Sequence, residues 1–299
     1  MIELELLAKA HKKRVLFCGE HIVDCYHYVR PLGRPTKDAI LSVEMLDSET
    51  FDGGATAAAV HIKDFCERVD IWNAGVMIEK HRYVERAHMH KLFQVYRPKS
   101  KIACNDPRED FCWYDAVIVA DYGHGMADER FLHSIQDARY LAVNVQTNSG
   151  NYGFNLATKY KRCDYLCVDE PEARLATQNR DGPIEHSFEL LSKIAPKVVI
   201  TLGKHGAIGC ANGAIDREAA FTDRVVDTMG AGDAFFALTA LVAQEAPMRE
   251  LLRIGNAAGA IKSQIVGHRQ GVTKDAITRE FENQKLQRCI GAGALAGAV

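Results

Sequence analysis

The sequence predicts an α/β fold with a doubly wound, mostly parallel sheet flanked by helices. Short apolar runs rich in Val and Ile alternate along the chain with longer stretches of helical periodicity, as in sheets covered by helices on both faces. The residues at or next to the ends of these runs are polar, namely Asp121, Asn144, Asp169 and Thr201. Because ligands of such sheets bind at the carboxyl ends of the strands, a binding site is expected there.

The predicted strands are continuously apolar rather than alternating, which is typical of strands buried on both faces. They are residues 15–18, 116–120, 140–145, 165–168 and 198–202. Helices are predicted at residues 55–66, 129–137, 170–177, 187–194, 232–244 and 248–264. We interpret residues 1–299 as one large domain.

Two segments interrupt this pattern. Residues 39–45 and 81–96 alternate polar and apolar side chains, as half-exposed antiparallel strands do. Between the strand-like residues 69–74 and His81 there is no room for a crossover helix, since such a connection needs about a dozen residues or more. The stretch 105–115 is short for a helix too.

Composition excludes several classes of function. A net charge of −2 provides no general attraction to nucleic acid or to an anionic membrane. No apolar run approaches the roughly 20 residues that span a bilayer, and the first residues are acidic where a signal peptide is basic. Nine cysteines, an odd number without a secretory signal, disfavour a disulfide framework. A cytoplasmic protein is therefore expected.

The run from Val225 to Ala237 is the most informative part of the chain. A β-branched strand end leads into the turn Gly230-Ala231-Gly232, then Asp233 and a helix of small residues. Such a turn gathers backbone N–H groups at a helix N-terminus, where the helix dipole also favours a polyphosphate. An Asp beside phosphate is explained as a base that takes a proton from an attacking hydroxyl. The alternative is that Asp233 only caps the helix.

The motif Asp227-Thr228-Met229-Gly230-Ala231-Gly232-Asp233 resembles the signature of the ribokinase/phosphofructokinase-B family of sugar kinases. Four further motifs resemble family elements and follow in the same order: Gly19 to Asp24, Asp52 to Ala55, Asp169 to Glu172, and Thr201 to Gly206. The set extends from about Val15 to Gly271, nearly the whole chain. Residues 120–125 and 144–160 are most similar to the heptose-phosphate kinase branch, which includes kinase domains fused to nucleotidyltransferases.

The resemblance implies a set of site residues. On the catalytic side it implies the turn Gly230-Ala231-Gly232 and Asp233 as the base, with the amides of Ala231, Gly232 and Asp233 stabilising the transferred phosphoryl group. On the nucleotide side it implies Thr201, Gly203, Lys204, Gly206, Asn256 and Asp227. Glu172 and Asp169 are implied near Mg²⁺, held through water. ATP and Mg²⁺ are the implied cofactors, with a monovalent cation such as K⁺ at loop 266–271.

On the sugar side the resemblance implies Asp24, Gly53, Gly54, Asp121, His124 and Arg82. Arg82 belongs to a group of basic residues in or beside residues 30–37 and 82–97, and an Arg fork suits a phosphorylated sugar. The family also implies a small β-lid within about residues 25–51 and 81–97, used for homodimer contacts. Position 57 departs from the family pattern, because Ala stands where a sugar-contacting Asn is common.

Other interpretations remain open for single motifs. Asp169 and Glu172 also suit an ordinary helix N-terminus, with Pro171 in its first turn. Residues 201–206 also suit a strand-to-hairpin turn, and Asn256 also suits a helix packed through small residues. For the whole chain, the main hypothesis is an ATP-dependent kinase of a heptose 7-phosphate. The alternatives are a kinase for a nucleoside or ketose phosphate and a non-catalytic nucleotide- or sugar-binding module.

Overall fold

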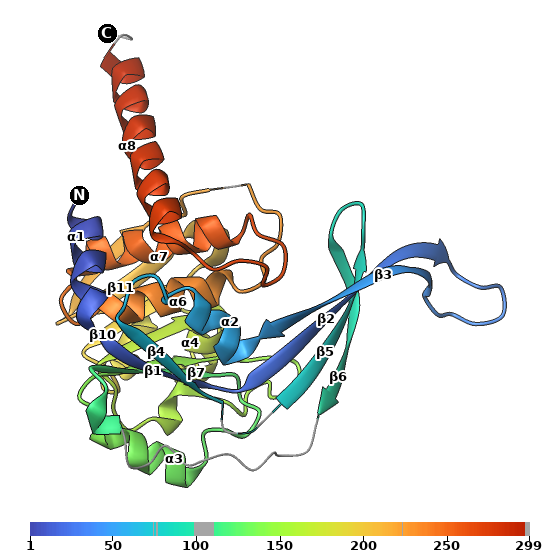
Figure 1. Ribbon diagram of the computed structural model, residues 1–299, viewed down its shortest axis with the longest axis horizontal. Helices are drawn as coiled ribbons and strands as arrows, with labels where there is room; N and C mark the ends of the chain where they lie inside the picture. Colours follow the sequence, from blue (N-terminus) through green and yellow to red (C-terminus); the bar gives the residue numbers. More distant parts are fainter. Residues whose placement is uncertain (74, 76, 99–110, 223, 297–299) are drawn as a thin grey trace.

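The computed structural model describes residues 1–73, 75, 77–98, 111–222 and 224–296 (Figure 1). The strands of its large sheet are β1 (Arg14–Gly19), β4 (Arg68–Trp72), β7 (Ala116–Asp121), β8 (Leu141–Val145), β9 (Tyr165–Asp169), β10 (Lys197–Thr201), β11 (Ala207–Ala211) and β12 (Ala214–Glu218). Their order across the sheet is β12-β11-β10-β9-β8-β7-β1-β4. All neighbours are parallel except the pairs β10–β11 and β11–β12. The predicted doubly wound, mostly parallel sheet is therefore confirmed.

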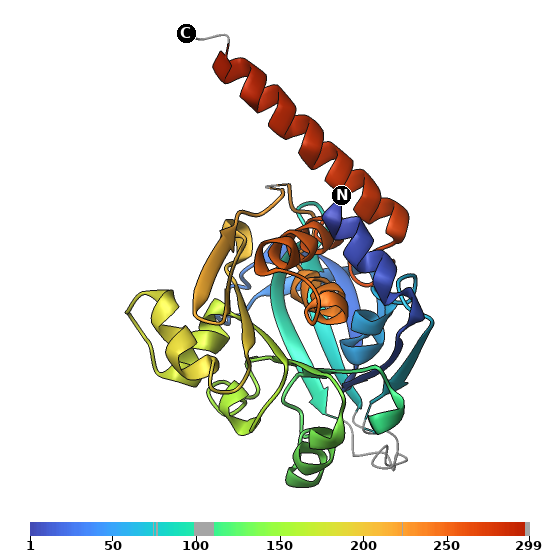
Figure 2. The same cartoon turned by 90° about the vertical axis from the view of Figure 1, so that its left-hand side faces the viewer.

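Helices cover both faces of the large sheet (Figure 2). The α-helices are α1 (Ile2–Lys9), α2 (Gly54–Val60), α3 (Glu129–Ser134), α4 (Glu170–Thr177), α5 (Phe188–Leu191), α6 (Ala231–Val242), α7 (Met248–Lys262) and α8 (Lys274–Ala296). Short 3₁₀ helices span Ala10–Lys12, Phe111–Trp113, Ile135–Asp137, Ala157–Lys159, Ile184–Ser187 and Gly203–His205. One hydrophobic core joins α1, α2, α6, α7 and α8 to the sheet, and a second joins α3, α4 and α5 to its other face.

Helix α6 occupies the centre of the first core. From Ala234 to Val242 every residue is buried, because the helix lies against both the sheet and α7. A helix that is apolar on all sides fits only such a position. The burial of α6 fixes where its N-terminus, and hence the glycine turn before it, meets the edge of the sheet.

A small sheet extends from the body (Figure 1). Its strands are β2 (His21–Gly33), β3 (Ser42–Gly53), β5 (Met77–Glu85) and β6 (His90–Pro98), in the order β3-β2-β5-β6. Strand β2 begins two residues after β1 ends, so a single stretch of chain passes from one sheet to the other at Glu20. Alternate residues of β2 and β5 are buried, and on the buried face these include the charged residues Asp24, Lys80 and Arg82. The period-2 pattern thus directs three charges toward the body.

Several predicted boundaries were wrong. The helix predicted at residues 55–66 ends at Val60, because the chain continues in tight turns in which Ile62 donates to Ala59 and Phe65 to Ile62. The helix predicted at 187–194 is regular only over Phe188–Leu191. The strand predicted at 39–45 begins at Ser42.

The missing crossover helix has a structural explanation. β4 lies at the edge of the large sheet, and the next strand, β5, pairs in parallel with β2 of the small sheet instead of returning to the large one. A crossover over the large sheet is therefore not needed at this point. Of the other short stretch, residues 105–110 lie outside the described part of the chain.

Over the described ranges, the helices are too short or too polar to cross a membrane.

Candidate active site

Helix α6 begins at a turn that presents backbone N–H groups. Gly230 caps the helix with a φ of +73°, in the left-handed region that glycine adopts without strain. A Cβ at this position would lie 3.1 Å from the ring of His268 and 3.3 Å from Cε of Lys262. Ala231 and Gly232 follow in the first turn and line a cavity. Because the first amides of a helix lack partners within the helix, this turn suits a phosphate group.

The carboxylate of Asp233 lies in the same turn and is oriented by two side chains. Gln146 donates from Nε2 to Oδ1 over 2.7 Å, and Tyr122 donates from Oη to the same oxygen over 3.2 Å. Burial raises the pKa of Asp233, and the nearby His268 and the hydrogen bond from Gln146 offset this only in part. A raised pKa makes Asp233 a stronger proton acceptor than an ordinary aspartate.

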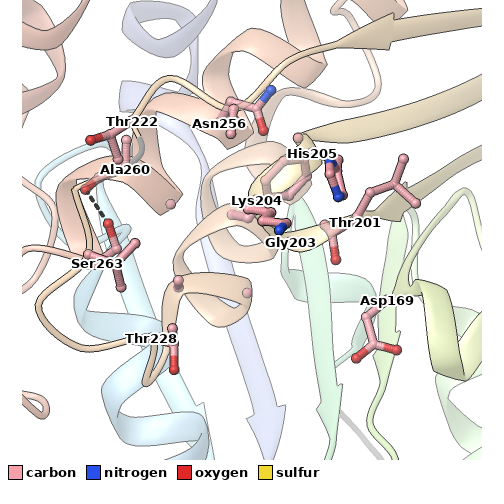
Figure 3. Close-up of a pocket in the computed structure, with 18 of the residues that line it drawn as sticks. Asp169, Thr201, Gly203, Lys204, His205, Thr222, Thr228, Asn256, Ala260 and Ser263 are labelled. Carbon is pink, nitrogen blue, oxygen red and sulfur yellow. Dashed lines mark hydrogen bonds between the residues drawn. The ribbon is translucent and has the colours of Figure 1, made fainter. Parts of the chain in front are cut away.

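A cavity of about 760 Å³ opens at the N-terminus of α6 (Figure 3). It lies at the carboxyl ends of β9 and β10, where a doubly wound sheet binds its ligands. Its lining includes six residues expected at the nucleotide and metal, namely Asp169, Thr201, Gly203, Lys204, Gly206 and Asn256. The volume is within the range of small-molecule sites. The structure therefore gathers these residues at one cavity.

One wall of this cavity is built by Gly206 and Asn256. Gly206 has a φ of +89°, and a Cβ there would lie 2.1 Å from the carbonyl oxygen of Glu218. Asn256 donates from Nδ2 to the carbonyls of Glu218 and Ala219 over 3.1 and 2.9 Å. The side-chain nitrogen of Asn256 is thus already used within the protein, in holding the segment after β12.

Asp169 and Glu172 form a capping box at the start of α4. Asp169 accepts a hydrogen bond from the Glu172 amide over 2.8 Å, and Glu172 accepts one from the Asp169 amide over 2.7 Å. Burial raises the pKa of both carboxyls, and the charge of Asp169 raises that of Glu172 further. The interpretation as a helix N-terminus therefore holds, and it places two buried carboxyls side by side, of which Glu172 holds a proton near neutral pH.

These two carboxylates fit a magnesium ion held through water. Among the described residues, no group of three or more His, Cys, Asp or Glu side chains is arranged to hold a metal directly. Mg²⁺ keeps most of its water when bound beside phosphates, so it needs few protein ligands. A divalent cation would also favour the ionised form of Glu172, which burial disfavours.

Asp227 does not line the cavity, contrary to its expected place among the nucleotide-binding residues. Its Oδ1 accepts hydrogen bonds from Lys91 over 2.9 Å and from the Met229 amide over 3.1 Å. Its Oδ2 accepts from Tyr26 and from the Gly267 amide, each over 3.0 Å. Burial raises the pKa of Asp227, but these bonds and the Lys91 charge lower it to about 2. Asp227 is therefore ionised and binds other parts of the protein.

Asp24 on β2 is paired with basic side chains. Arg82 donates from Nε to Oδ1 over 2.9 Å, and His268 lies 3.2 Å from Oδ2. Burial raises the pKa of Asp24, but the His268 hydrogen bond and the charges of Arg82 and Lys80 outweigh it and leave the pKa below its usual value. The expected sugar ligands Asp24 and Arg82 are thus adjacent, and they bind each other in this structure.

Gly53 and Gly54 allow β3 and α2 to approach this pair. A Cβ on Gly53 would lie 2.5 Å from Oδ2 of Asp24, and a Cβ on Gly54 would lie 2.2 Å from the carbonyl of Glu20. Gly54 also has a φ of +59°. A side chain at either position would displace the carboxylate or the backbone beneath it.

Asp121, an expected sugar ligand, is fully buried and its carboxylate binds other parts of the protein. The carboxylate accepts hydrogen bonds from Tyr160 over 2.8 Å and from the Gly123 amide over 3.0 Å, and it pairs with Lys159. Its side chain holds the loop after β7 against residues 155–160. The motif Asp121 to Gly125 is therefore structural at its first residue.

His124 lies nearer the site. Its amide donates to the buried carboxylate of Glu20 over 2.8 Å, and its Nε2 is buried without a partner among the described residues. Burial, with the nearby charge of Lys80, lowers the pKa of His124 to about 4. The imidazole is therefore neutral at neutral pH, and one ring nitrogen remains for a ligand.

Sequence reasoning missed Lys80, Glu20 and Gln146. Lys80 precedes Arg82 by two residues on a strand with period-2 alternation, so its inward direction could have been predicted. Glu20 accepts from the amides of Tyr122, His124 and Met126 at the junction of the two sheets, and no sequence pattern indicated these contacts. Gln146 follows β8, the position where polar residues were expected.

Comparison with known proteins agrees with this geometry. Residues 141–275 match the pfkB family carbohydrate kinases. Over 154 residues, which are 49% of this chain, the sequence is 32% identical to the bifunctional protein HldE of Wolinella succinogenes. That match covers 32% of HldE, so the chain spans about a third of the length of this relative.

Three solved structures share the fold. Ribokinase from Thermotoga maritima matches with a TM-score of 0.70 and 15% identity, over 90% of this chain and 99% of that one. Ribokinase from Arabidopsis thaliana, complexed with ribose and ATP, matches with a TM-score of 0.66 and 14% identity, over 90% and 98% of the two chains. Phosphofructokinase-2 from Escherichia coli, in complex with potassium, matches with a TM-score of 0.66 and 14% identity, over 91% and 99%.

The match of residues 141–275 to the carbohydrate kinases, together with the ribokinase-like fold, indicates a phosphotransferase of the sugar kinase class. Residues 141–275 are similar to the pfkB family carbohydrate kinases, and the partial similarity to HldE supports the resemblance to the heptose-phosphate kinase branch.

The raised pKa of Glu172 predicts a pH-dependent stability. The folded protein holds a proton that the unfolded chain releases, so stability falls as pH rises from the usual glutamate range toward the raised folded value. Glu172→Gln should weaken this dependence. We expect wild-type Tm to fall by at least about 2 °C more than the variant's between about pH 5 and pH 8.5, measured by calorimetry. Glu189→Gln, an exposed control, should behave as wild type, and parallel curves for all three proteins would contradict the assignment.

Proposed function

We propose that this protein transfers the γ-phosphoryl group of ATP to a hydroxyl of a sugar phosphate, with a heptose 7-phosphate as the preferred acceptor. The observation that carries the proposal is the position of Asp233. It follows Gly232, which lines the cavity, and its carboxylate is bound by Gln146 and Tyr122, while the charges of His268 and of Lys80 on the small sheet act on its pKa. A carboxylate in this place can reach a hydroxyl on one side and a phosphate on the other.

In the proposed reaction, the acceptor hydroxyl oxygen attacks the γ-phosphorus and the bond to the bridging oxygen of ADP breaks. Asp233 accepts the hydroxyl proton, and the bridging oxygen leaves with the bonding electrons. The amides of Gly232 and Asp233, in the first turn of α6, stabilise the charge on the transferred group. Gln146 and Tyr122 keep the Asp233 carboxylate in one orientation. This positioning lowers the entropic cost of reaching a reactive geometry.

ATP is the proposed donor because the cavity combines a glycine turn, a helix N-terminus and a wall that includes Ala220, Phe221 and Thr222. Lys204 at its edge can pair with a phosphate. Magnesium, bound through water at Asp169 and Glu172, would neutralise charge on the phosphates. The Arabidopsis ribokinase of the same fold was solved with ATP, which supports this choice of donor.

A phosphorylated acceptor is proposed because cations face the site. Lys80 is 8% exposed, the charges of Asp24, Asp233 and Glu20 act on its pKa, and its ammonium lies 5.5 Å from the centroid of the Tyr96 ring. Within the described residues its ammonium makes no salt bridge, so it remains available to an anion. The partial match to HldE supports a heptose phosphate over other sugar phosphates.

The non-catalytic alternative has one observation in its favour. Asp24, the expected ligand of sugar hydroxyls, is already bound by Arg82 and His268. A sugar would have to share or displace these partners. Nucleotide binding without turnover of any sugar would support this alternative.

Replacing the proposed base tests the reaction. We expect Asp233→Asn to lower kcat by about 10²–10⁴-fold, the usual contribution of a general base, with Tm little changed. The assay is ATP consumption with D-glycero-heptose 7-phosphate and a panel of sugars, with the product identified by mass spectrometry. Asp181→Asn, at an exposed loop position, is the matched control. Equal turnover in wild type and Asp233→Asn would remove the assigned base.

Removing the charge of Lys80 tests the substrate class. Lys80→Met should raise KM for the phosphorylated sugar by about 10–100-fold, the loss expected for one charge-assisted contact. Turnover of the unphosphorylated sugar should fall much less, because that sugar has no phosphate for Lys80 to bind. Lys63→Met, at an exposed position after α2, is the control. A Lys80→Met variant that treats both sugars as wild type does would argue against phosphate recognition here.

We also propose a homodimer through the small sheet. Its face away from the body carries stacked rings, with Tyr83 and Phe93 4.3 Å apart and His27 and Tyr83 4.8 Å apart. Phe93 and Val95 are 40% and 43% exposed, although both are large and apolar. β3 and β6 are edge strands, which leave backbone groups free for a partner.

A charged substitution on this face should therefore break the dimer. We expect Phe93→Asp to shift the wild-type dimer to a monomer in sedimentation velocity, because an unpaired carboxylate would be buried. Phe154→Asp, at a residue that is 94% exposed and outside the sheet, should remain dimeric. A monomeric wild type would refute the proposal.

A further inference from the structure

Lys262, near the end of α7, is a fully buried lysine whose ammonium is surrounded by backbone carbonyls. Its side chain is 0% exposed. Nζ donates to the carbonyl oxygens of Met229 over 2.6 Å, Gly267 over 2.7 Å and Ile265 over 3.3 Å. An ammonium has three N–H donors, so these three acceptors satisfy it completely. The arrangement is a small cage of oxygen atoms around a single positive charge.

The cage belongs to the phosphate-binding turn. Met229 immediately precedes Gly230, and Gly267 lies in the loop after α7. Asp227 accepts from the amides of Met229 and Gly267, while Lys262 donates to the carbonyls of the same two residues. The Asp227 carboxylate and the Lys262 ammonium therefore bind both the N–H and the C=O groups of Met229 and Gly267. Lys262 Cε would also lie only 3.3 Å from a Cβ on Gly230.

This contact determines how the turn presents its amides. In a planar trans peptide the C=O and N–H groups point in opposite directions. Because Lys262 holds the Met229 carbonyl, the N–H of Gly230 in the same peptide unit points away from Lys262. A lost charge at this position would allow that peptide to rotate and would leave the Met229 carbonyl without its partner.

Loop 266–271 was expected to help bind a monovalent cation, and the E. coli phosphofructokinase-2 of the same fold was solved with potassium. In the described part of the chain, a separate K⁺ does not fit at the Gly267 carbonyl, because the Lys262 ammonium already binds this oxygen. Ammonium and potassium ions are similar in size and both bind carbonyl oxygens.

We propose that the Lys262 ammonium is a built-in monovalent cation that positions the phosphate-binding turn, so that this kinase needs no added K⁺. Lys262 is a positioning residue, because it acts on the amides of the turn and not on the substrate. Burial lowers its pKa, but the nearby charges of Asp227 and Asp233 favour the charged form. The tests that measure turnover or nucleotide binding depend on the proposed function, whereas the tests that measure Tm do not.

The first test uses the unmodified protein. Turnover and Tm are measured in about 0.1 M KCl and in tetramethylammonium chloride of equal ionic strength. We expect both salts to give turnover equal within about twofold and the same Tm. A rise in turnover of about tenfold or more that is specific to K⁺ would overturn the proposal.

The second test uses two substitutions that differ in the space they leave. Lys262→Ala removes the charge and opens the cage, so turnover should fall by at least about tenfold and return when K⁺ or NH₄⁺ is added. Lys262→Met removes the charge but fills the space, so added K⁺ should not restore it. Lys197→Ala is the matched control, because its ammonium also binds backbone carbonyls, those of Ala243 and Ala246, far from the turn. It should lose Tm without any dependence on K⁺.

Two measurements separate this inference from the proposed reaction. The Tm of Lys262→Ala should rise with K⁺ beyond its rise with tetramethylammonium, and its affinity for a non-hydrolysable ATP analogue should recover in parallel. Neither requires turnover of any sugar, so they hold even if the acceptor proposed above is wrong. A folded Lys262→Ala protein whose Tm and analogue affinity ignore K⁺ would refute the built-in cation. If that variant does not fold, the salt response of the wild type decides.

Discussion

The hydrogen bonds of the Asp227 carboxylate are the interaction on which the rest of the site depends. They join the small sheet, through Tyr26 and Lys91, to the glycine turn at Met229 and to the loop after α7 at Gly267. Three segments far apart in the sequence thereby share one acceptor. Since buried polar groups are costly when unpaired, the position of each segment constrains the other two. The turn is thereby held in one geometry by the protein itself.

Charge balance explains why so many ionised groups are found together. Glu20, Asp24, Asp227 and Asp233 lie near Lys80, Arg82, Lys91 and Lys262, and most of these groups are buried. Burial of one charge disfavours folding unless an opposite charge or hydrogen bonds compensate. Most members have such partners within the protein. Lys80 is the exception among the described residues, and the adjacent buried carboxyls of Asp169 and Glu172, whose ionised forms burial disfavours, are a second. A phosphorylated acceptor and a hydrated divalent cation are the ligands that would correct these two imbalances.

The sequence predicted the nucleotide side better than the sugar side. Thr201, Gly203 and Gly206 follow one strand directly, and Gly230 to Asp233 begin one helix, so local pattern determines which way they lie. The sugar side is formed where β2 and β5 pair, and the partners Asp24 and Arg82 are 58 residues apart. Asp121 and Asp227 were expected to bind ligands because one ends a strand and the other begins a signature motif. In the sequence, an Asp at such a position looks the same whether its side chain binds a ligand or another part of the protein. Their partners, Tyr160 in one case and Lys91 in the other, are found only in the folded chain.

By itself the sequence determined the parallel sheet, the glycine turn and the carboxylate beside it, because each depends on residues next to one another or on a repeating hydrophobic period. Tertiary structure alone decided which charges are free and which are paired. Lys262 shows the difference, since in the sequence it is an ordinary basic residue near the end of a helix. Only the folded chain brings the carbonyls of Met229, Ile265 and Gly267 around its ammonium, because long-range packing and not local pattern sets the distances between them.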